Sequence, residues 1–293
     1  MPDSRPVPVT VPKVRATKVR DGHQPLVMVT AYDAPGARIV DAAGVDLILV
    51  GDSVANVILG YDDTLQVTIE DMAHHVAAVA RAKPGALIVG DLPWMSYHVD
   101  VADTVRNGAM LIRAGAQCVK LEGGAVRAPM VEALVNAEIP VMGHIGLTPQ
   151  SLLALGGFRV QGRDDEAAAA LIIGAQALME AGVYAVVVEG VPEKVGYALT
   201  DAIDVPTIGI GAGAGCDGQV LVLHDLLGMT ERTAKFVRRY ATIADDATAA
   251  VAAFAAVVRS GAFPAEAEVY HCPSARVQWL FRPPCVTDRW LLS

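Results

Sequence analysis

Three acidic residues follow short apolar runs at widely separated points of the chain: Asp52, Asp91 and Glu122. Lys120 and His144 occupy equivalent places, within or directly after such a run. Converging carboxylates repel one another unless a cation or a proton neutralises them. Oxygen ligands of this kind suit Mg²⁺, with Mn²⁺ as the alternative, better than zinc. If the fold brings these positions together, the residues predict a metal site that could hold a bidentate 2-keto acid.

Each acid taken alone also has a structural explanation, because Asp and Ser often cap a helix that starts after a strand. Three acids on successive runs, with a lysine and a histidine beside them, favour catalysis instead. The adjacent His74 and His75 fall on a predicted helix and point in different directions, so they do not predict a shared metal site.

The elements that must position these side chains are eight short apolar runs, most of them followed by a helical stretch. The runs are Leu26–Tyr32, Leu47–Val50, Leu87–Val89, Cys118–Leu121, Val141–Met142, Ala185–Val188, Thr207–Ile210 and Val220–Leu223. Strands that alternate with helices predict a parallel sheet. Eight such units favour a closed (β/α)8 TIM-type barrel, in which catalytic groups lie at the C-terminal strand ends. The open Rossmann-like alternative lacks its G-x-G-x-x-G motif after the first run.

The predicted helices are Ala-rich, and several end in Ala-Gly, which is typical of a helix C-terminus. They are Ala34–Ala43, Ile69–Ala82, Val101–Ala114, Arg127–Ala137, Glu166–Ala181, Glu193–Asp201 and Asp245–Arg259. Thr68 is the predicted N-cap of the second helix. We expect one α/β catalytic domain over residues 1–263, with a short N-terminal helix, and an extended C-terminal tail over residues 264–293.

Composition excludes several classes of function. The chain has 293 residues, 53% of them hydrophobic and 5% aromatic, which predicts a core of Val, Ile, Leu and Ala. A net charge of -9 argues against nucleic-acid binding. No apolar run is long enough for a membrane span, and no signal-like segment is visible, so we expect a cytoplasmic protein. The four cysteines form no C-x-x-C pair and are predicted to be free thiols, with Cys118 in the core.

A series of motifs in order along the chain resembles the ketopantoate hydroxymethyltransferase family, from about Lys13 to about Phe263. The motifs are Val29–Asp33, Val50–Ser53, Gly60–Leu65, Thr68–His75, Gly90–Pro93, Val119–Gly124, Gly143–Gln150, Gly209–Gly215 and Asp217–Val220. The resemblance implies transfer of a hydroxymethyl group from 5,10-methylenetetrahydrofolate to 3-methyl-2-oxobutanoate. The products would be 2-dehydropantoate and tetrahydrofolate, on the route to pantothenate and coenzyme A. It also implies Mg²⁺ as the metal and a homo-oligomer, commonly a decamer.

The same resemblance implies a role for each strand-end residue. The metal positions are Asp52, Asp91 and Glu122; the keto-acid contacts are Asp52, Ser53, Asp91 and Lys120; and the general base is Glu189. His144 is expected to handle a second proton or to donate a hydrogen bond to the keto acid, and Lys120 to hold the substrate carboxylate or support the metal cluster. We interpret the glycine-rich loop Gly211–Gly215 as lining the folate side.

Two segments depart from the family pattern. Gly190 follows the expected base, where other members commonly have a different small or apolar residue, so the loop could be looser. Val269–Cys272 replaces an acidic, histidine-containing ending. Two other functions stay open: a Mg²⁺-dependent carbon–carbon lyase or mutase of the same barrel type acting on a 2-keto or phosphonate acid, and a non-catalytic binding protein on an inherited barrel.

Overall fold

The computed structural model describes residues 8–271, in which eight parallel strands close into a barrel in chain order. The strands are β1 (Leu26–Thr30), β2 (Leu47–Val50), β3 (Leu87–Asp91), β4 (Cys118–Glu122), β5 (Val141–Gly146), β6 (Ala185–Glu189), β7 (Thr207–Ile210) and β8 (Gly218–Leu221). Hydrogen bonds between β1 and β8 complete the closure. The predicted (β/α)8 barrel is therefore confirmed, and the open sheet is excluded.

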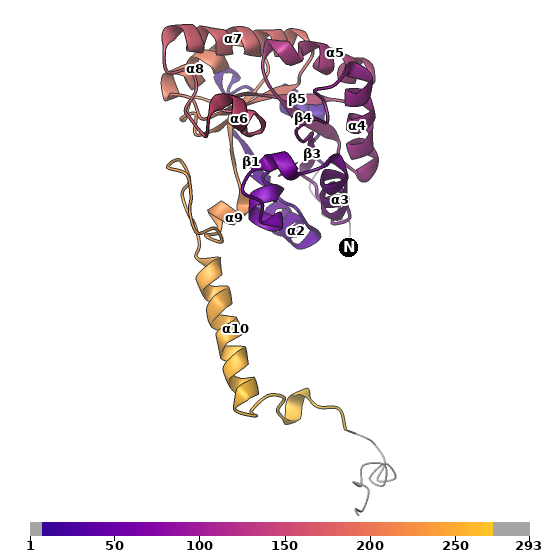
Figure 1. Ribbon diagram of the computed structural model, residues 1–293, viewed down its shortest axis with the longest axis vertical. Coiled ribbons are helices and arrows are strands. Elements are labelled where there is room, and N and C mark those ends of the chain that lie inside the picture. The colour runs from indigo at the N-terminus through magenta and orange to yellow at the C-terminus, as the bar shows by residue number, and fades with distance from the viewer. Residues whose placement is uncertain (1–7, 272–293) are drawn as a thin grey trace, which may run out of the picture. The chain divides into compact units, whose positions relative to one another are not determined.

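Helices lie outside the strands (Figure 1). The main ones are α2 (Ala34–Ala42), α3 (Ile69–Ala80), α4 (Val101–Ala114), α5 (Ala128–Asn136), α7 (Asp165–Glu180) and α8 (Glu193–Ala202). Each matches a predicted helix to within two residues at either end. The predicted N-terminal helix is α1 (Val11–Arg15), whereas the short helices α6 (Leu152–Leu155) and α9 (Leu223–Leu226) were not predicted. Thr68 caps α3 as expected, in a reciprocal capping box with Asp71.

The core has two layers, because alternate residues of each strand point to opposite faces. One set fills the barrel interior, including Met28, Leu47 and Val89, and Val14 of α1 packs against it. The other set, including Ile48 and Val119, packs against the surrounding helices. The interior layer fixes which strand residues face the barrel axis, and this determines the site described below.

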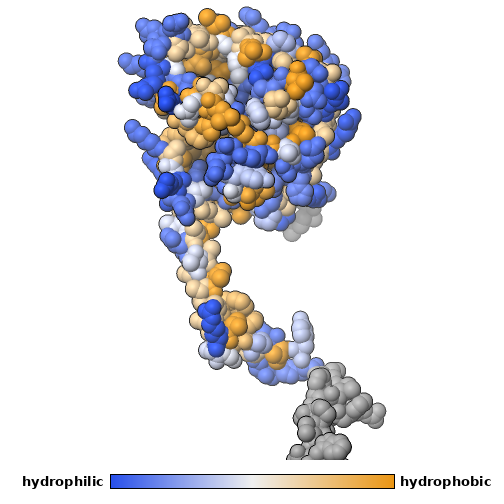
Figure 2. Space-filling model, in the orientation of Figure 1, coloured by the Kyte–Doolittle hydropathy of each residue, from blue (hydrophilic) through white to orange (hydrophobic). Residues whose placement is uncertain are grey.

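The chain divides into two compact units after Thr242. The second unit contains α10 (Ile243–Arg259), an Ala- and Val-rich helix with Asp245 and Asp246 in its first turn. Within the barrel unit, Figure 2 shows apolar side chains gathered over the part of the surface where α6 lies. Among residues 8–271, no helix combines the length and the apolar character needed to cross a membrane. The predicted domain limit at residue 263 stays a prediction, and the predicted tail lies largely outside the described residues.

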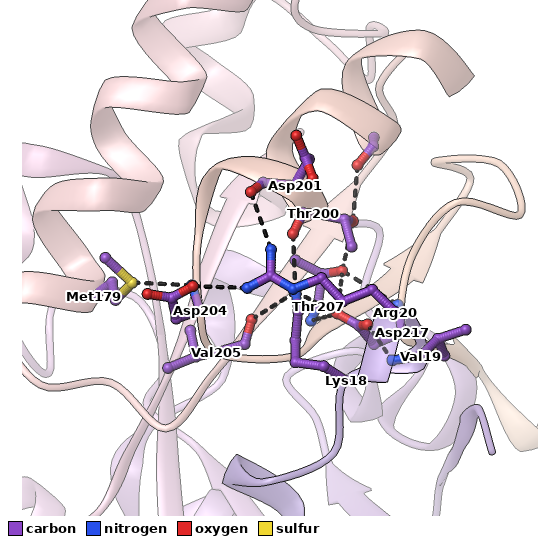
Figure 3. A network of polar contacts seen from close by, with 11 residues as sticks. Lys18, Val19, Arg20, Met179, Thr200, Asp201, Asp204, Val205, Thr207 and Asp217 are labelled. Atoms are coloured by element: carbon purple, nitrogen blue, oxygen red, sulfur yellow. Dashed lines mark hydrogen bonds and ion pairs between the residues drawn. The ribbon is translucent and has the colours of Figure 1, made fainter. Parts of the chain in front are cut away.

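A buried ion pair fixes the N-terminal segment to the barrel where β8 begins (Figure 3). Lys18 Nζ lies 2.9 Å from Asp217 Oδ2 and also donates to the carbonyls of Thr200 and Val205 at 2.8 and 3.3 Å. Asp217 accepts further hydrogen bonds from the backbone N–H groups of Val19 and Thr207. Both charges are therefore paired and hydrogen-bonded, as buried charges must be.

Candidate active site

The pleat of the strands aims five polar side chains into the C-terminal end of the barrel. Val89, Cys118, Met142 and Val187 belong to the interior layer, so residues two or four positions later on the same strands face the interior too. The five residues selected in this way are Asp91, Lys120, Glu122, His144 and Glu189. The first four are at most 3% exposed, whereas the Glu189 side chain is 16% exposed. The structure thus brings together all five of these predicted residues.

Asp52 and Ser53 lie in the turn after β2 and complete the cluster. The Asp52 backbone N–H donates to Asp91 Oδ2 at 3.2 Å, and the Ser53 hydroxyl is 2.8 Å from the Tyr32 hydroxyl. Helix caps elsewhere in the barrel use different acids, namely Asp33, Asp100 and Asp164. The helix-capping explanation therefore does not account for the acids of the cluster.

The cluster carries more negative than positive charge. Lys120 Nζ lies 2.8 Å from Asp91 Oδ1 and 3.7 Å from Glu122 Oε1. Burial lowers the pKa of Lys120, but the neighbouring carboxylates outweigh it and raise that pKa, so Lys120 is an ammonium ion. Burial, followed by the charges of Asp91 and Glu122, raises the pKa of Asp52 well above its ordinary value. That shift indicates that the positive charge near Asp52 is too small to stabilise the ionised form of its carboxyl group.

His144 bridges two of the carboxylates. Its Nδ1 is 3.3 Å from Glu122 Oε1, and its Nε2 is 3.3 Å from Glu189 Oε2. Burial and the Lys120 charge lower the pKa of His144, but Glu122 and Glu189 outweigh them and raise it to about 9. The raised pKa favours a positively charged His144 beside Glu122 and Glu189, although its Nε2 forms no hydrogen bond of good geometry within residues 8–271.

Two residues absent from the predicted set, Tyr97 and Gln150, orient the acids. The Glu122 N–H donates to the Tyr97 hydroxyl at 3.2 Å, so that hydroxyl donates its own hydrogen to Gln150 Oε1 at 2.6 Å. This fixes the amide, whose Nε2 donates to Asp52 Oδ2 and to the Leu92 carbonyl, both at 3.0 Å. The Gln150 backbone N–H also donates to Glu122 Oε2 at 3.1 Å. Both residues lie in connections after strands. The Gly143–Gln150 motif contains Gln150, whereas no motif of the sequence contains Tyr97.

The donor set fits a divalent cation. The buried oxygens Asp91 Oδ1 and Glu122 Oε1 have no hydrogen bond of good geometry within residues 8–271. Mg²⁺ usually takes one or two carboxylates and completes its shell with water and substrate oxygens. In the described part of the chain, no three or more His, Cys, Asp or Glu side chains form a group that could hold a metal ion by themselves. The set Asp52, Asp91 and Glu122 stays a prediction.

Two cavities meet at Glu189. The inner one, of about 130 Å³, is lined by the charged cluster, including Asp52, Lys120 and His144. The outer one, of about 990 Å³, is lined mainly by the loops after the strands, including Gly211 and Gly213 of the predicted glycine-rich loop. Six residues line both cavities, and Glu189 is the only acid among them; the others are Ser53, Asn56, Phe158, Ile210 and Val222. A carboxylate at this junction can act between a small acid in the inner cavity and a larger molecule in the outer one.

The other sequence interpretations have clear outcomes. Cys118 is fully buried in the barrel interior, as predicted, with its Sγ 3.0 Å from the Tyr184 hydroxyl. His75 Nδ1 lies 2.8 Å from the Tyr32 carbonyl oxygen. Gly190 has a φ of +56°, and both its N–H and its carbonyl are hydrogen-bonded, to Ile210 O and Gln161 N. Glycine therefore suits this position and need not loosen the loop.

Comparison with known proteins decides the family. The model of the ketopantoate hydroxymethyltransferase family matches residues 8–266. The chain belongs to this family. A 3-methyl-2-oxobutanoate hydroxymethyltransferase of Pyrobaculum arsenaticum is 54% identical over 254 residues, which cover 87% of this chain and 96% of that protein. One from Methylobacterium sp. (strain 4-46) is 53% identical over 267 residues, covering 91% and 92% of the two chains.

Solved structures show the same fold at much lower identity. Phosphonopyruvate hydrolase in complex with oxalate and Mg²⁺ superposes with a TM-score of 0.57 and 14% identity, over 92% of this chain and 95% of that one. At this identity the likeness shows the barrel fold alone. It gives the lyase or mutase alternative no support beyond a shared architecture.

Proposed function

We propose that this member of the ketopantoate hydroxymethyltransferase family transfers a hydroxymethyl group from 5,10-methylenetetrahydrofolate to 3-methyl-2-oxobutanoate. Water supplies the hydroxyl oxygen, and the products are 2-dehydropantoate and tetrahydrofolate. Relatives that carry this enzyme name at 53–54% identity support the proposal. The observation that carries it is the position of Glu189, which lines both a small charged cavity and a large outer one.

The inner cavity suits the keto acid. Lys120 is an ammonium ion that can pair with the substrate carboxylate, and Ser53 offers a hydroxyl at the junction with the outer cavity. Asp52, Asp91 and Glu122 would hold Mg²⁺, which would stabilise negative charge developing on the 2-oxo oxygen. The large outer cavity leaves room for the folate, with the glycine-rich loop on its wall.

Glu189 is placed to take the proton from C3 of the keto acid. The electron pair of that C–H bond then forms the C2–C3 double bond of an enolate. The C3 of this enolate attacks the methylene carbon as one of its two bonds to folate nitrogen breaks, and water replaces the second nitrogen, so that the oxygen of water becomes the hydroxyl group. The two nitrogens take the proton from Glu189 and one proton from water, which gives tetrahydrofolate. His144 Nε2, 3.3 Å from Glu189 Oε2, stays beside the carboxyl group as it gains the proton. Lys120 keeps the substrate oriented throughout.

A direct assay tests the function. Full-length protein with Mg²⁺, 3-methyl-2-oxobutanoate and 5,10-methylenetetrahydrofolate should form 2-dehydropantoate, and omission of the folate should abolish it. Product formation that does not require folate would refute the proposed transfer and favour the lyase or mutase alternative. The cytoplasmic location and a homo-oligomer, a decamer by family resemblance, remain proposals that cell fractionation and light scattering would test.

A further inference from the structure

Two exposed phenylalanine side chains line the outer cavity. Phe158 is 61% exposed and also lines the inner cavity, whereas Phe236 is 42% exposed and lines the outer cavity alone. Phe158 follows α6, and Phe236 belongs to the loop after α9. A side-chain carbon at Gly211 would lie only 2.7 Å from the Phe236 ring, so the glycine-rich loop makes room for that ring. Exposed aromatic rings around a cavity commonly mark a surface that a ligand covers.

Three cationic side chains line the same cavity from the same two segments: Arg159 beside Phe158, and Arg232 and Lys235 before Phe236. All three are exposed, in a chain whose net charge is -9. Within the described residues, none of them forms an ion pair with an acid of the protein. Their charges are therefore available to an anionic ligand.

The loop that carries Arg232 and Lys235 is folded on itself. Arg239 Nη2 donates to the carbonyls of Thr230 and Glu231 at 2.7 and 3.2 Å. The Thr230 hydroxyl in turn donates to Asp225 Oδ1 at 2.6 Å, which engages one of the acids lining the cavity. The outer cavity is lined by three acids, Glu189, Glu193 and Asp225, and by the three cations. All three cations lie on the two segments that carry Phe158 and Phe236, so the positive charge is gathered beside the two rings.

We propose that this rim, formed by Phe158, Arg159, Arg232, Lys235 and Phe236, binds the arylamide arm of the folate and selects forms with several glutamyl carboxylates. The inference rests on the proposed function. The reactive methylene group must reach Glu189 at the inner end of the cavity, so the remaining arm of the folate leads outward. Its aminobenzoyl ring lies against the two phenylalanine rings, and its γ-linked glutamates meet the three cations.

Steady-state rates with mono- and triglutamyl 5,10-methylenetetrahydrofolate test the rim. Each exposed ion pair contributes modestly and is screened by salt, so we expect the triglutamyl form to have a KM lower by about tenfold at low ionic strength, and less at 0.5 M salt. The double variant Arg232→Gln/Lys235→Gln should lose that preference. Arg81→Gln, a matched exposed arginine after α3, should keep it.

The possible results distinguish a failure of the proposed rim from a failure of the proposed reaction. Exchange of the C3 proton of the keto acid needs no folate, so it should be the same in all these variants. Product formation with equal KM for both folates in the unaltered protein would overturn the rim proposal and leave the proposed function intact. So would a preference that survives the double variant or is lost equally in Arg81→Gln. A folded protein that forms no product with either folate would overturn both.

Discussion

Replacing Lys18 by methionine should be among the most destabilising single changes in the barrel unit, although it lies away from the charged cluster. Lys18 and Asp217 are 2% and 1% exposed. The substitution removes three donated hydrogen bonds and leaves the carboxylate and two carbonyls without that partner. Removing one member of a buried ion pair costs about 3–5 kcal/mol, because the other charge stays buried. Three further bonds from Val19 and Thr207 retain Asp217, so we expect the lower half of that range.

Urea unfolding followed by circular dichroism, at one fixed protein concentration, measures this loss. Arg20→Met is the matched control from the same network (Figure 3), because the Arg20–Asp204 pair is 2.7 Å long but 41% and 85% exposed. Exposed pairs contribute little, so the control should barely move the midpoint. If both variants lost the same free energy of unfolding, burial would not be the reason that the Lys18–Asp217 pair stabilises the fold more than the exposed Arg20–Asp204 pair.

Three further changes test the site and the core. Asp91→Asn should weaken Mg²⁺ binding on the order of 100-fold by titration calorimetry, and unchanged affinity would rule out its ligand role. Gln150→Met leaves Asp52, the Tyr97 hydroxyl and the Leu92 carbonyl without a buried partner, so KM for the keto acid should rise about tenfold or more. A normal KM would show that the amide does not position Asp52. Burial raises the pKa of the Cys118 thiol to about 12, so alkylation at pH 8 should require unfolding; rapid labelling of the native peptide would contradict this.

The sequence predicted the barrel well because buried parallel strands have a strong signal. All eight apolar runs became strands, and the capping threonine and the Ala-rich helices were where the pattern put them. The predicted ends of the strands were less accurate. β8 begins at Gly218 rather than at Val220, and β5 continues to Gly146 rather than ending at Met142. Hydrogen bonds to a neighbouring strand keep these residues in the sheet although their own β propensity is low.

Site residues on strands or directly after them, such as Asp52, could be predicted, whereas those further along the loops could not. The period of two fixes the direction of Lys120 and Glu189 once the interior layer is known. Tyr97 and Gln150 depend instead on where two loops, 53 residues apart, meet in space. The outer cavity has the same origin, since its walls come from loops whose convergence no local pattern encodes. The metal ligands and the catalytic roles remain inferences from geometry and from family resemblance.

Exchange of the C3 proton of 3-methyl-2-oxobutanoate in heavy water, compared between the unaltered protein and Glu189→Gln, tests the central claim most directly. With Mg²⁺ and no folate, the unaltered protein should exchange the proton, and Glu189→Gln should bind the keto acid without exchanging it. Exchange at the normal rate in the folded variant would show that another group removes the proton and that the junction of the two cavities has been wrongly assigned.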